Sequence, residues 1–138
     1  MNSDPAVQKL IGIIFPIIGG GLLIGSVVSA TFTYQFISIA SRAEGKVVKL
    51  NAGGAHPSIK FTPSSEKIAI EFSGSGYINY AVGDKVTVLY LKNDTYPSRF
   101  QTNIDNPGAL WFGTAILSFL GMSFAIAGLY TRHVYKQE

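Results

Sequence analysis

Two long stretches of the chain contain no charged residue, and they dominate its pattern of apolar and polar positions. The first covers residues 10–41 and the second covers residues 106–131. About 20 apolar residues are enough to cross the hydrocarbon core of a bilayer as a helix. The pattern therefore predicts two transmembrane helices, over residues 10–34 and 107–131. The first run is longer than the apolar core of a signal peptide, so we interpret it as a retained anchor.

Small residues recur at four-residue spacing in both predicted helices. They are Gly21, Gly25 and Ser29 in the first helix, and Gly121 and Ala125 in the second. Small side chains allow two membrane helices to approach each other closely. We predict that these five residues are helix-packing positions. Their partner is either the other helix of the same chain or a helix of a neighbouring subunit.

Basic residues beside the two spans predict the orientation of the chain. On the side shared by both termini these residues are Lys9, Arg132 and Lys136. Such residues are enriched on the cytoplasmic side of a membrane, whereas a long connecting region is translocated largely regardless of its charge. We therefore expect residues 1–9 and 132–138 to be cytoplasmic tails. Residues 42–105 would then form a periplasmic or extracellular domain.

The central region has the period-two alternation that is typical of half-buried strands. Residues 59–62 and 67–72 show this alternation. Residues 45–50 are β-prone, and residues 85–91 and 100–104 are also predicted strands, which gives five short strands in all. An open sheet of this size would leave exposed edges, so the segments predict a small barrel or a curled sheet. The expected fold class is a membrane α+β protein. Two transmembrane helices would flank a small five-stranded β-barrel-like (OB/SH3-like) extracytoplasmic domain.

Composition supports a membrane protein and excludes several kinds of function. Only 14% of the residues are charged, compared with about 25% in a typical soluble domain. The net charge of +3 is small, and part of it lies beside the spans, so nucleic acid is not an expected partner. The chain has no cysteine, which excludes disulfides, thiolate nucleophiles and cysteine-based zinc sites.

The sequence shows no arrangement of residues that is typical of catalysis or metal binding. The two histidines, His56 and His133, lie far apart in the sequence, so neither has a neighbouring histidine to form a metal-binding pair. The carboxylates are scattered, and none forms an obvious acid–base pair. Neither predicted span contains an ionisable residue, and such residues usually mark transport pathways. We therefore expect a non-enzymatic protein with no catalytic residues, no metal and no cofactor.

Three motifs in the central region occur in a recognisable order. They are Glu44-Gly45-Lys46-Val47, Pro57-Ser58-Ile59-Lys60-Phe61 and the segment from Tyr80 to Tyr90. With the flanking helices they resemble domain-of-unknown-function family 3592, a family of small two-span membrane proteins. This sequence departs from the family pattern at Leu91-Lys92, where Asp-Pro is usual, and at Tyr96-Pro97, where Asn-Pro is usual. The resemblance implies this fold and topology and a location in the bacterial inner membrane, but no enzymatic activity.

The stretch that departs from the family pattern is also the best candidate for partner binding. Its aromatic and basic residues are Tyr90, Lys92, Tyr96, Arg99 and Phe100. Aromatic and arginine side chains are common anchors of protein interfaces, and loops often carry binding residues. The alternative is that the aromatic residues fill the core of the domain and that Tyr96-Pro97 only closes the barrel.

Two functions are compatible with these features. In the main interpretation, the chain is an accessory or stabilising subunit of a larger membrane complex. Its partners would then be other membrane protein subunits or a second copy of the same chain. In the alternative, the chain is an immunity protein that neutralises an antibacterial toxin at the outer face of the membrane, as some small bacterial proteins of this build do. An enzyme or a lipid-binding module is least favoured.

Overall fold

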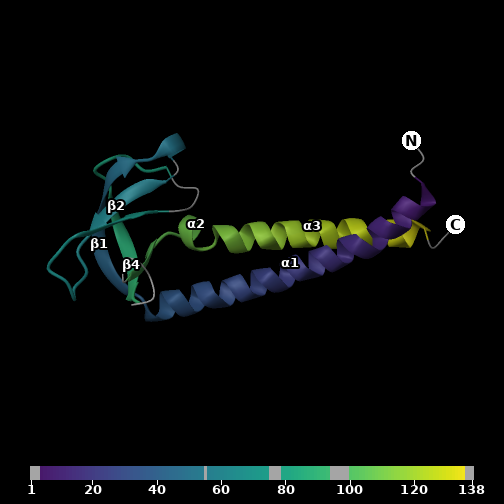
Figure 1. The fold of residues 1–138 in the computed structure, drawn as a ribbon, viewed down its shortest axis with the longest axis horizontal. Coiled ribbons are helices and arrows are strands. Elements are labelled where there is room, and N and C mark those ends of the chain that lie inside the picture. The colour runs from purple at the N-terminus through teal and green to yellow at the C-terminus, as the bar shows by residue number, and fades with distance from the viewer. Residues whose placement is uncertain (1–3, 55, 75–78, 94–99, 136–138) are drawn as a thin grey trace. The chain divides into compact units, whose positions relative to one another are not determined.

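Two compact units make up the chain (Figure 1). The computed structural model describes residues 4–54, 56–74, 79–93 and 100–135. A helical unit is built from Met1–Thr31 and Gly113–Glu138, and a β-domain is built from Phe32–Phe112. The β-domain therefore includes the last residues of the first long helix and the short segment that precedes the second one.

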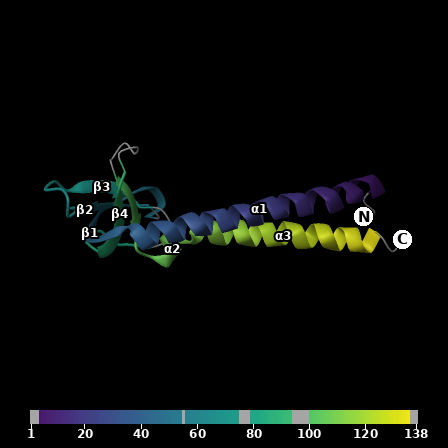
Figure 2. The same ribbon diagram turned by 90° about the horizontal axis from the view of Figure 1, so that it is seen from below.

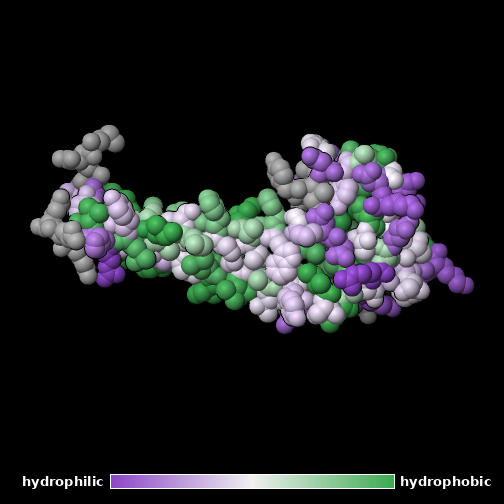
Figure 3. All heavy atoms as spheres, turned by 180° about the vertical axis from the view of Figure 1, so that it is seen from behind, coloured by the Kyte–Doolittle hydropathy of each residue, from purple (hydrophilic) through white to green (hydrophobic). Residues whose placement is uncertain are grey.

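The helical unit contains two long apolar helices, α1 (Pro5–Ile39) and α3 (Phe112–Tyr135). They run side by side in both Figure 1 and Figure 2. Each is long and apolar enough to cross a membrane. In the most apolar window of α1 and α3, only 17% and 11% of the residues are buried inside the chain. Figure 3 shows apolar side chains along their surface. This exposure distinguishes both helices from the core helix of a soluble protein.

The predicted second helix is divided in two by Trp111. A short helix, α2 (Pro107–Leu110), precedes it, and the side chain of Asn106 caps α2 by accepting a hydrogen bond from the Gly108 N–H at 2.8 Å. Ala109 packs against the core of the β-domain. The sequence signal for a helix start at Pro107 is therefore correct, but α2 belongs to the β-domain and α3 begins only at Phe112.

The β-domain contains one antiparallel sheet whose strand order is β3-β2-β1-β4-β5. The strands are β1 (Ser41–Leu50), β2 (Pro57–Phe61), β3 (Ile70–Ser73), β4 (Lys85–Lys92) and β5 (Phe100–Ile104). All five predicted strands are present. The sheet curls into a half barrel, which confirms the expected fold class of two apolar helices flanking a five-stranded barrel-like domain.

Large apolar side chains fill the inner face of the curled sheet. Val47, Ile59 and Val88 are completely buried there. Gly45 allows this close packing, because an added Cβ would lie 2.7 Å from Val88 Cγ2 and 2.9 Å from Ile59 Cγ2. Aromatic rings line the same core, and their centroids are 5.7 Å apart for Phe61–Phe72, 5.4 Å for Phe61–Tyr90 and 6.0 Å for Tyr90–Phe100.

Two contacts hold the curl. The hydroxyl of Tyr90 on β4 accepts a hydrogen bond from the Ser64 N–H at 3.1 Å and shares one with Ser64 Oγ at 2.8 Å. These bonds tie β4 to the connection between β2 and β3, and they lower the pKa of Tyr90. At the other end, an added Cβ on Gly74 would lie 2.7 Å from Ile104 Cδ1. The residue after β3 therefore lies close to the last residue of β5.

Candidate functional site

Two of the five predicted partner-binding residues lie in the core instead of on the surface. Tyr90 is only 5% exposed and Phe100 only 3%. Both side chains point inward, so a partner could not reach them. For these two residues the alternative interpretation holds, in which the aromatic side chains fill the core of the domain. Lys92 is exposed at the end of β4. Tyr96 and Arg99 lie outside the described residues, so their predicted role stays a prediction.

In the helical unit, α1 contacts α3 through positions that alternate between four-residue and three-residue spacing. On α1 these positions are Gly12, Pro16, Gly19, Leu23 and Ser26, and they face Arg132, Gly128, Ala125, Gly121 and Ser118 on α3. Such spacing is that of a coiled-coil seam. The two helices are antiparallel, because the residue numbers of the contacting positions fall along α3 as they rise along α1.

Three predicted helix-packing residues belong to this seam. Gly121 and Ala125 lie against α1, and an added Cβ on Gly19 would be 2.5 Å from Ala125 N. The Ser29 hydroxyl shares a hydrogen bond with the Thr114 hydroxyl at 2.8 Å.

The other two predicted packing residues are not in the seam. An added Cβ on Gly21 or Gly25 would meet nothing within 4 Å. A helix turns by about 100° per residue, so each four-residue step moves about 40° past the starting face. A strict four-residue repeat therefore drifts away from a seam with a mean spacing of 3.5 residues. For Gly21 and Gly25, contact with a neighbouring subunit stays a prediction.

The outer face of the sheet carries a row of three lysines across neighbouring strands. Lys46 on β1 lies opposite Lys60 on β2 and opposite Lys85 on β4. All three side chains are exposed. Like charges on directly opposed strand positions repel each other and destabilise a sheet. The row continues to Glu71 on β3, which lies opposite Lys60 and offsets part of this repulsion. The remaining positive charge makes the row a candidate binding feature.

A shallow groove of about 430 Å³ runs along this row. We call it the lysine groove, and its lining includes Lys46, Lys60, Lys85, Glu44, Val48 and Gly83. Three lysines and one glutamate give the lining a net charge of +2. Val48 is 38% exposed, and two more exposed apolar side chains, Ile68 and Val82, directly adjoin lining residues in the sequence. The groove thus combines positive charge with exposed apolar contacts.

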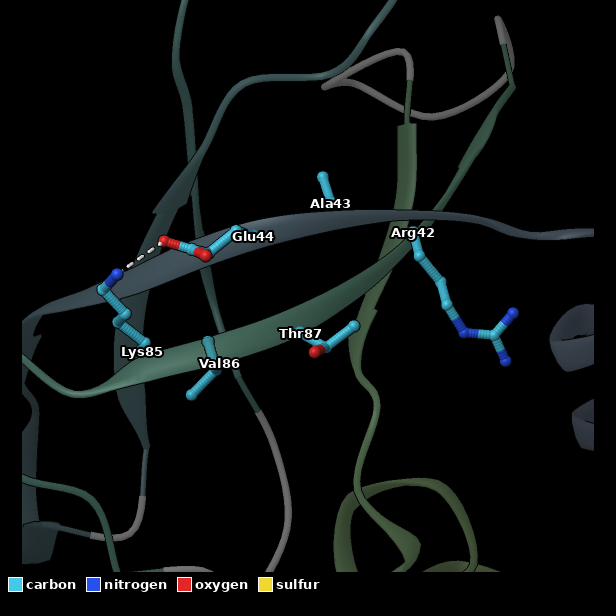
Figure 4. Close-up of a pocket in the computed structure, with 6 residues that line it drawn as sticks. All are labelled: Arg42, Ala43, Glu44, Lys85, Val86 and Thr87. Carbon is cyan, nitrogen blue, oxygen red and sulfur yellow. Dashed lines mark ion pairs between the residues drawn. The ribbon is translucent and has the colours of Figure 1, made fainter.

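Ion pairs fix the charged groups next to the groove. Figure 4 shows Lys85 and Glu44 pointing toward each other from β4 and β1, with a distance of 3.2 Å between Nζ and Oε1. Arg42 extends away from Glu44, and its Nε lies 3.2 Å from Oδ2 of Asp105. These pairs engage Lys85 and Arg42, and Glu71 on β3 lies opposite Lys60. Lys46 is therefore the groove lysine whose directly opposed residues are both lysines.

Another part of the outer face is covered. Leu89 is fully buried although strand alternation places it on this face, and Phe36 near the end of α1 is also buried. Phe32, Thr33 and Phe36 line a small cavity together with residues of β5. The end of α1 therefore lies over this part of the sheet and leaves the lysine groove open.

The groove fits recognition better than chemistry. Among the described residues, no group of three or more histidine, aspartate or glutamate side chains could hold a metal ion. The groove contains no histidine and pairs its one carboxylate with Lys85. An open, cationic surface with exposed apolar side chains can bind an acidic protein surface.

The lysine groove cannot be recognised from the sequence alone. The lysines are separated by up to 39 positions in the sequence, and only the strand register places them in one row. Strand alternation does predict which lysines share the outer face of the sheet. It does not predict which lysines are neighbours.

Comparison with known proteins gives one informative relative. The chain is 38% identical over 116 residues to the immune protein Tsi4 of Pseudomonas aeruginosa, and the alignment covers 83% of this chain and 77% of the relative. No family model matches the chain, and no solved structure matches it. The relationship to an immune protein confirms the expectation that the chain is not an enzyme. This chain therefore belongs to the family of the immune protein Tsi4.

Proposed function

We propose that the chain is an immunity protein that binds a protein toxin and neutralises it at the outer face of the membrane. The observation that carries this proposal is the 38% identity to an immune protein over 83% of the chain. This relationship favours the alternative interpretation of the sequence over the main one. An accessory subunit of a larger membrane complex has no comparable support.

We further propose that α1 and α3 cross the bacterial inner membrane and leave both termini in the cytoplasm. The length, apolar composition and exposure of the two helices support two spans. Lys9 and Arg132, at the ends that would share one side, support the orientation because basic residues favour the cytoplasmic side. The β-domain would then meet its partner on the periplasmic or extracellular side.

The lysine groove is the surface that we propose for toxin binding. Lys46 and Lys60 are exposed and lie directly opposite each other, and Glu71 lies opposite Lys60 alone. An acidic segment of the toxin would therefore be attracted most strongly to Lys46. Electrostatic complementarity of this kind accelerates association and selects against wrong partners. Val48, 38% exposed, would add apolar contact within the same groove.

The test is protection of cells against a toxin. The product of a gene adjacent to the gene for this chain is directed to the periplasm of a sensitive strain, with and without the chain. We expect growth arrest without the chain and growth with it. Failure of the chain to restore growth against any toxic neighbour would contradict the proposed function.

Charge reversal then tests the groove. We expect Lys46→Glu with Lys60→Glu to weaken toxin binding at least tenfold, measured by pull-down from mild detergent over a range of salt concentrations. The matched control is Lys49→Glu with Lys67→Glu, which reverses two exposed lysines that do not line the groove. Equal loss in both double variants would contradict the groove, and retained protection by the control would leave the immunity function in place.

A further inference from the structure

A second groove lies in the helical unit, at the end where α1 begins and α3 ends. Its volume is about 630 Å³. Its lining combines apolar residues of α1 with polar residues from both helices, and includes Gly12, Ile13, Ile17, Lys9, Arg132 and Tyr135. We propose that this groove, named here the terminal groove, binds an anionic phospholipid whose phosphate contacts Lys9 and Arg132. The proposal rests on the membrane insertion proposed above.

The two cations lie at the same level of the helix pair. An added Cβ on Gly12 would lie 3.4 Å from Cβ of Arg132, so these two residues are directly opposed. Lys9 precedes Gly12 by three residues and therefore lies on the same face of α1. Both cations also line the terminal groove. A single phosphate group could therefore contact both side chains.

The charges of the helical unit favour an anion at this end. Among its described residues, Asp4 has the only carboxylate. That carboxylate accepts a hydrogen bond from the Ala6 N–H at 2.9 Å, at the start of α1. Lys9 and Arg132 carry the opposite charge, and basic pockets between membrane helices on the cytoplasmic side bind anionic headgroups.

The apolar part of the groove suits an acyl chain better than a free anion. Ile13 is 50% exposed and Ile17 is 68% exposed. Both follow Lys9 along α1 toward the middle of the membrane, so a lipid with its phosphate at Lys9 would extend its chains over them. A free phosphate would use the cations and leave this apolar surface uncovered. Two cations next to an exposed apolar surface therefore favour a lipid over a free anion as the ligand.

The experiment measures lipid retained by the protein purified in mild detergent. Phosphatidylglycerol and phosphatidylcholine with identical acyl chains are added in equal amounts, and bound lipid is quantified by native mass spectrometry. We expect the unaltered protein to retain phosphatidylglycerol at least fivefold more than phosphatidylcholine. The double variant Lys9→Gln with Arg132→Gln should lose this preference, whereas Lys49→Gln with Lys67→Gln in the β-domain should keep it.

Further measurements separate the alternatives. Ile17→Trp, which places a bulky side chain in the apolar part, should also reduce phosphatidylglycerol retention. Unchanged preference in the Lys9 and Arg132 double variant would overturn the proposal. Displacement of the lipid by millimolar inorganic phosphate would also overturn it, because it would identify a free-anion site. Detection of a protein adduct instead of a lipid adduct would also overturn the proposal, because it would show that a protein segment occupies the groove.

The proposed immunity function can fail independently of this lipid site. We expect Ile17→Trp, which lowers lipid retention but keeps the basic residues that support the orientation, to remain in the membrane after carbonate extraction. It should also protect cells against the toxin as well as the unaltered protein does. Loss of lipid preference with retained protection supports the lipid site alone. Lack of protection by the unaltered protein, with lipid preference retained, would contradict only the immunity function.

Discussion

The helical unit and the β-domain bury opposite kinds of side chain. At the seam between α1 and α3, the buried residues include Gly12, Gly19, Gly121, Gly128 and Ser26, while large apolar side chains face outward. In the β-domain the completely buried side chains are large and apolar, and the exposed outer face is charged.

This difference agrees with the membrane insertion proposed above for the helical unit. In water, burial of apolar surface is the main favourable contribution to folding. Between helices in lipid that contribution is absent, so association depends on close backbone approach and on hydrogen bonds. The same kind of substitution should therefore have different effects in the two units, and four variants test this.

The largest effect is expected from Ile59→Ala in the β-domain. Ile59 is completely buried, and truncation of such a residue costs about 2–5 kcal/mol through lost burial and the cavity that remains. Circular dichroism of the tyrosine signal during chemical unfolding would measure this loss. Lys60→Ala, at the neighbouring exposed position, should change the free energy of unfolding by about 0.5 kcal/mol or less. Similar losses for both would contradict a core centred on Ile59.

The next effect is expected from Gly19→Leu in the helical unit. An added Cβ there would lie 2.5 Å from backbone N of Ala125, so the helices must separate, at a cost of about 1–3 kcal/mol. Gly21→Leu introduces the same side chain where an added Cβ meets nothing within 4 Å, and it should leave the helix pair intact.

A disulfide reporter measures this difference in membranes. The chain has no cysteine, and the hydroxyls of Ser26 and Ser118 are in contact. Ser26→Cys with Ser118→Cys should therefore cross-link on mild oxidation. We expect Gly19→Leu to reduce this cross-linking several-fold and Gly21→Leu to leave it unchanged. The opposite order would place the seam on the Gly21–Gly25 face.

A smaller effect is expected from Tyr90→Phe, which keeps the ring and removes the hydroxyl that binds Ser64. The Ser64 N–H would lose its acceptor, so the β-domain should lose about 1 kcal/mol of stability. Thermal unfolding of the purified protein would measure this. Tyr34→Phe is a suitable comparison, because Tyr34 is 69% exposed. A Tyr90 variant as stable as the Tyr34 variant would show that the hydroxyl does not hold the curl.

The smallest effect is expected from Ser26→Ala, which removes hydroxyl contacts with Ser118 and Thr114 across the seam. Interhelical hydrogen bonds of membrane proteins contribute about 0.6 kcal/mol on average. The helical signal during titration with a denaturing detergent would report the change. Ser123→Ala removes a hydroxyl bond within α3 alone and should have less effect. A larger effect for Ser123 would mean that the hydroxyls stabilise single helices and not their association.

Local patterns in the sequence are enough to predict the elements and the fold class. Absence of charge over residues 10–41 and 106–131 predicts long apolar helices because a bilayer-spanning segment tolerates few charges. Period-two alternation predicts two of the five strands because successive strand side chains point to opposite faces, and runs of β-prone residues predict the other three. The sequence also contained a motif order that resembles family 3592, and that resemblance stays a prediction.

Contacts between distant residues do not follow from these local patterns. Four-residue spacing suggested Gly21 and Gly25 as packing positions, but the rotation of α1 that satisfies the whole seam places Gly12 and Gly19 there. Tyr90 and Phe100 are of residue types that are common at interfaces, but in the folded sheet both side chains point into the core. Strand register places Lys46, Lys60 and Lys85 side by side. Helix rotation and strand register depend on contacts between residues far apart in the sequence, and local patterns do not encode those contacts.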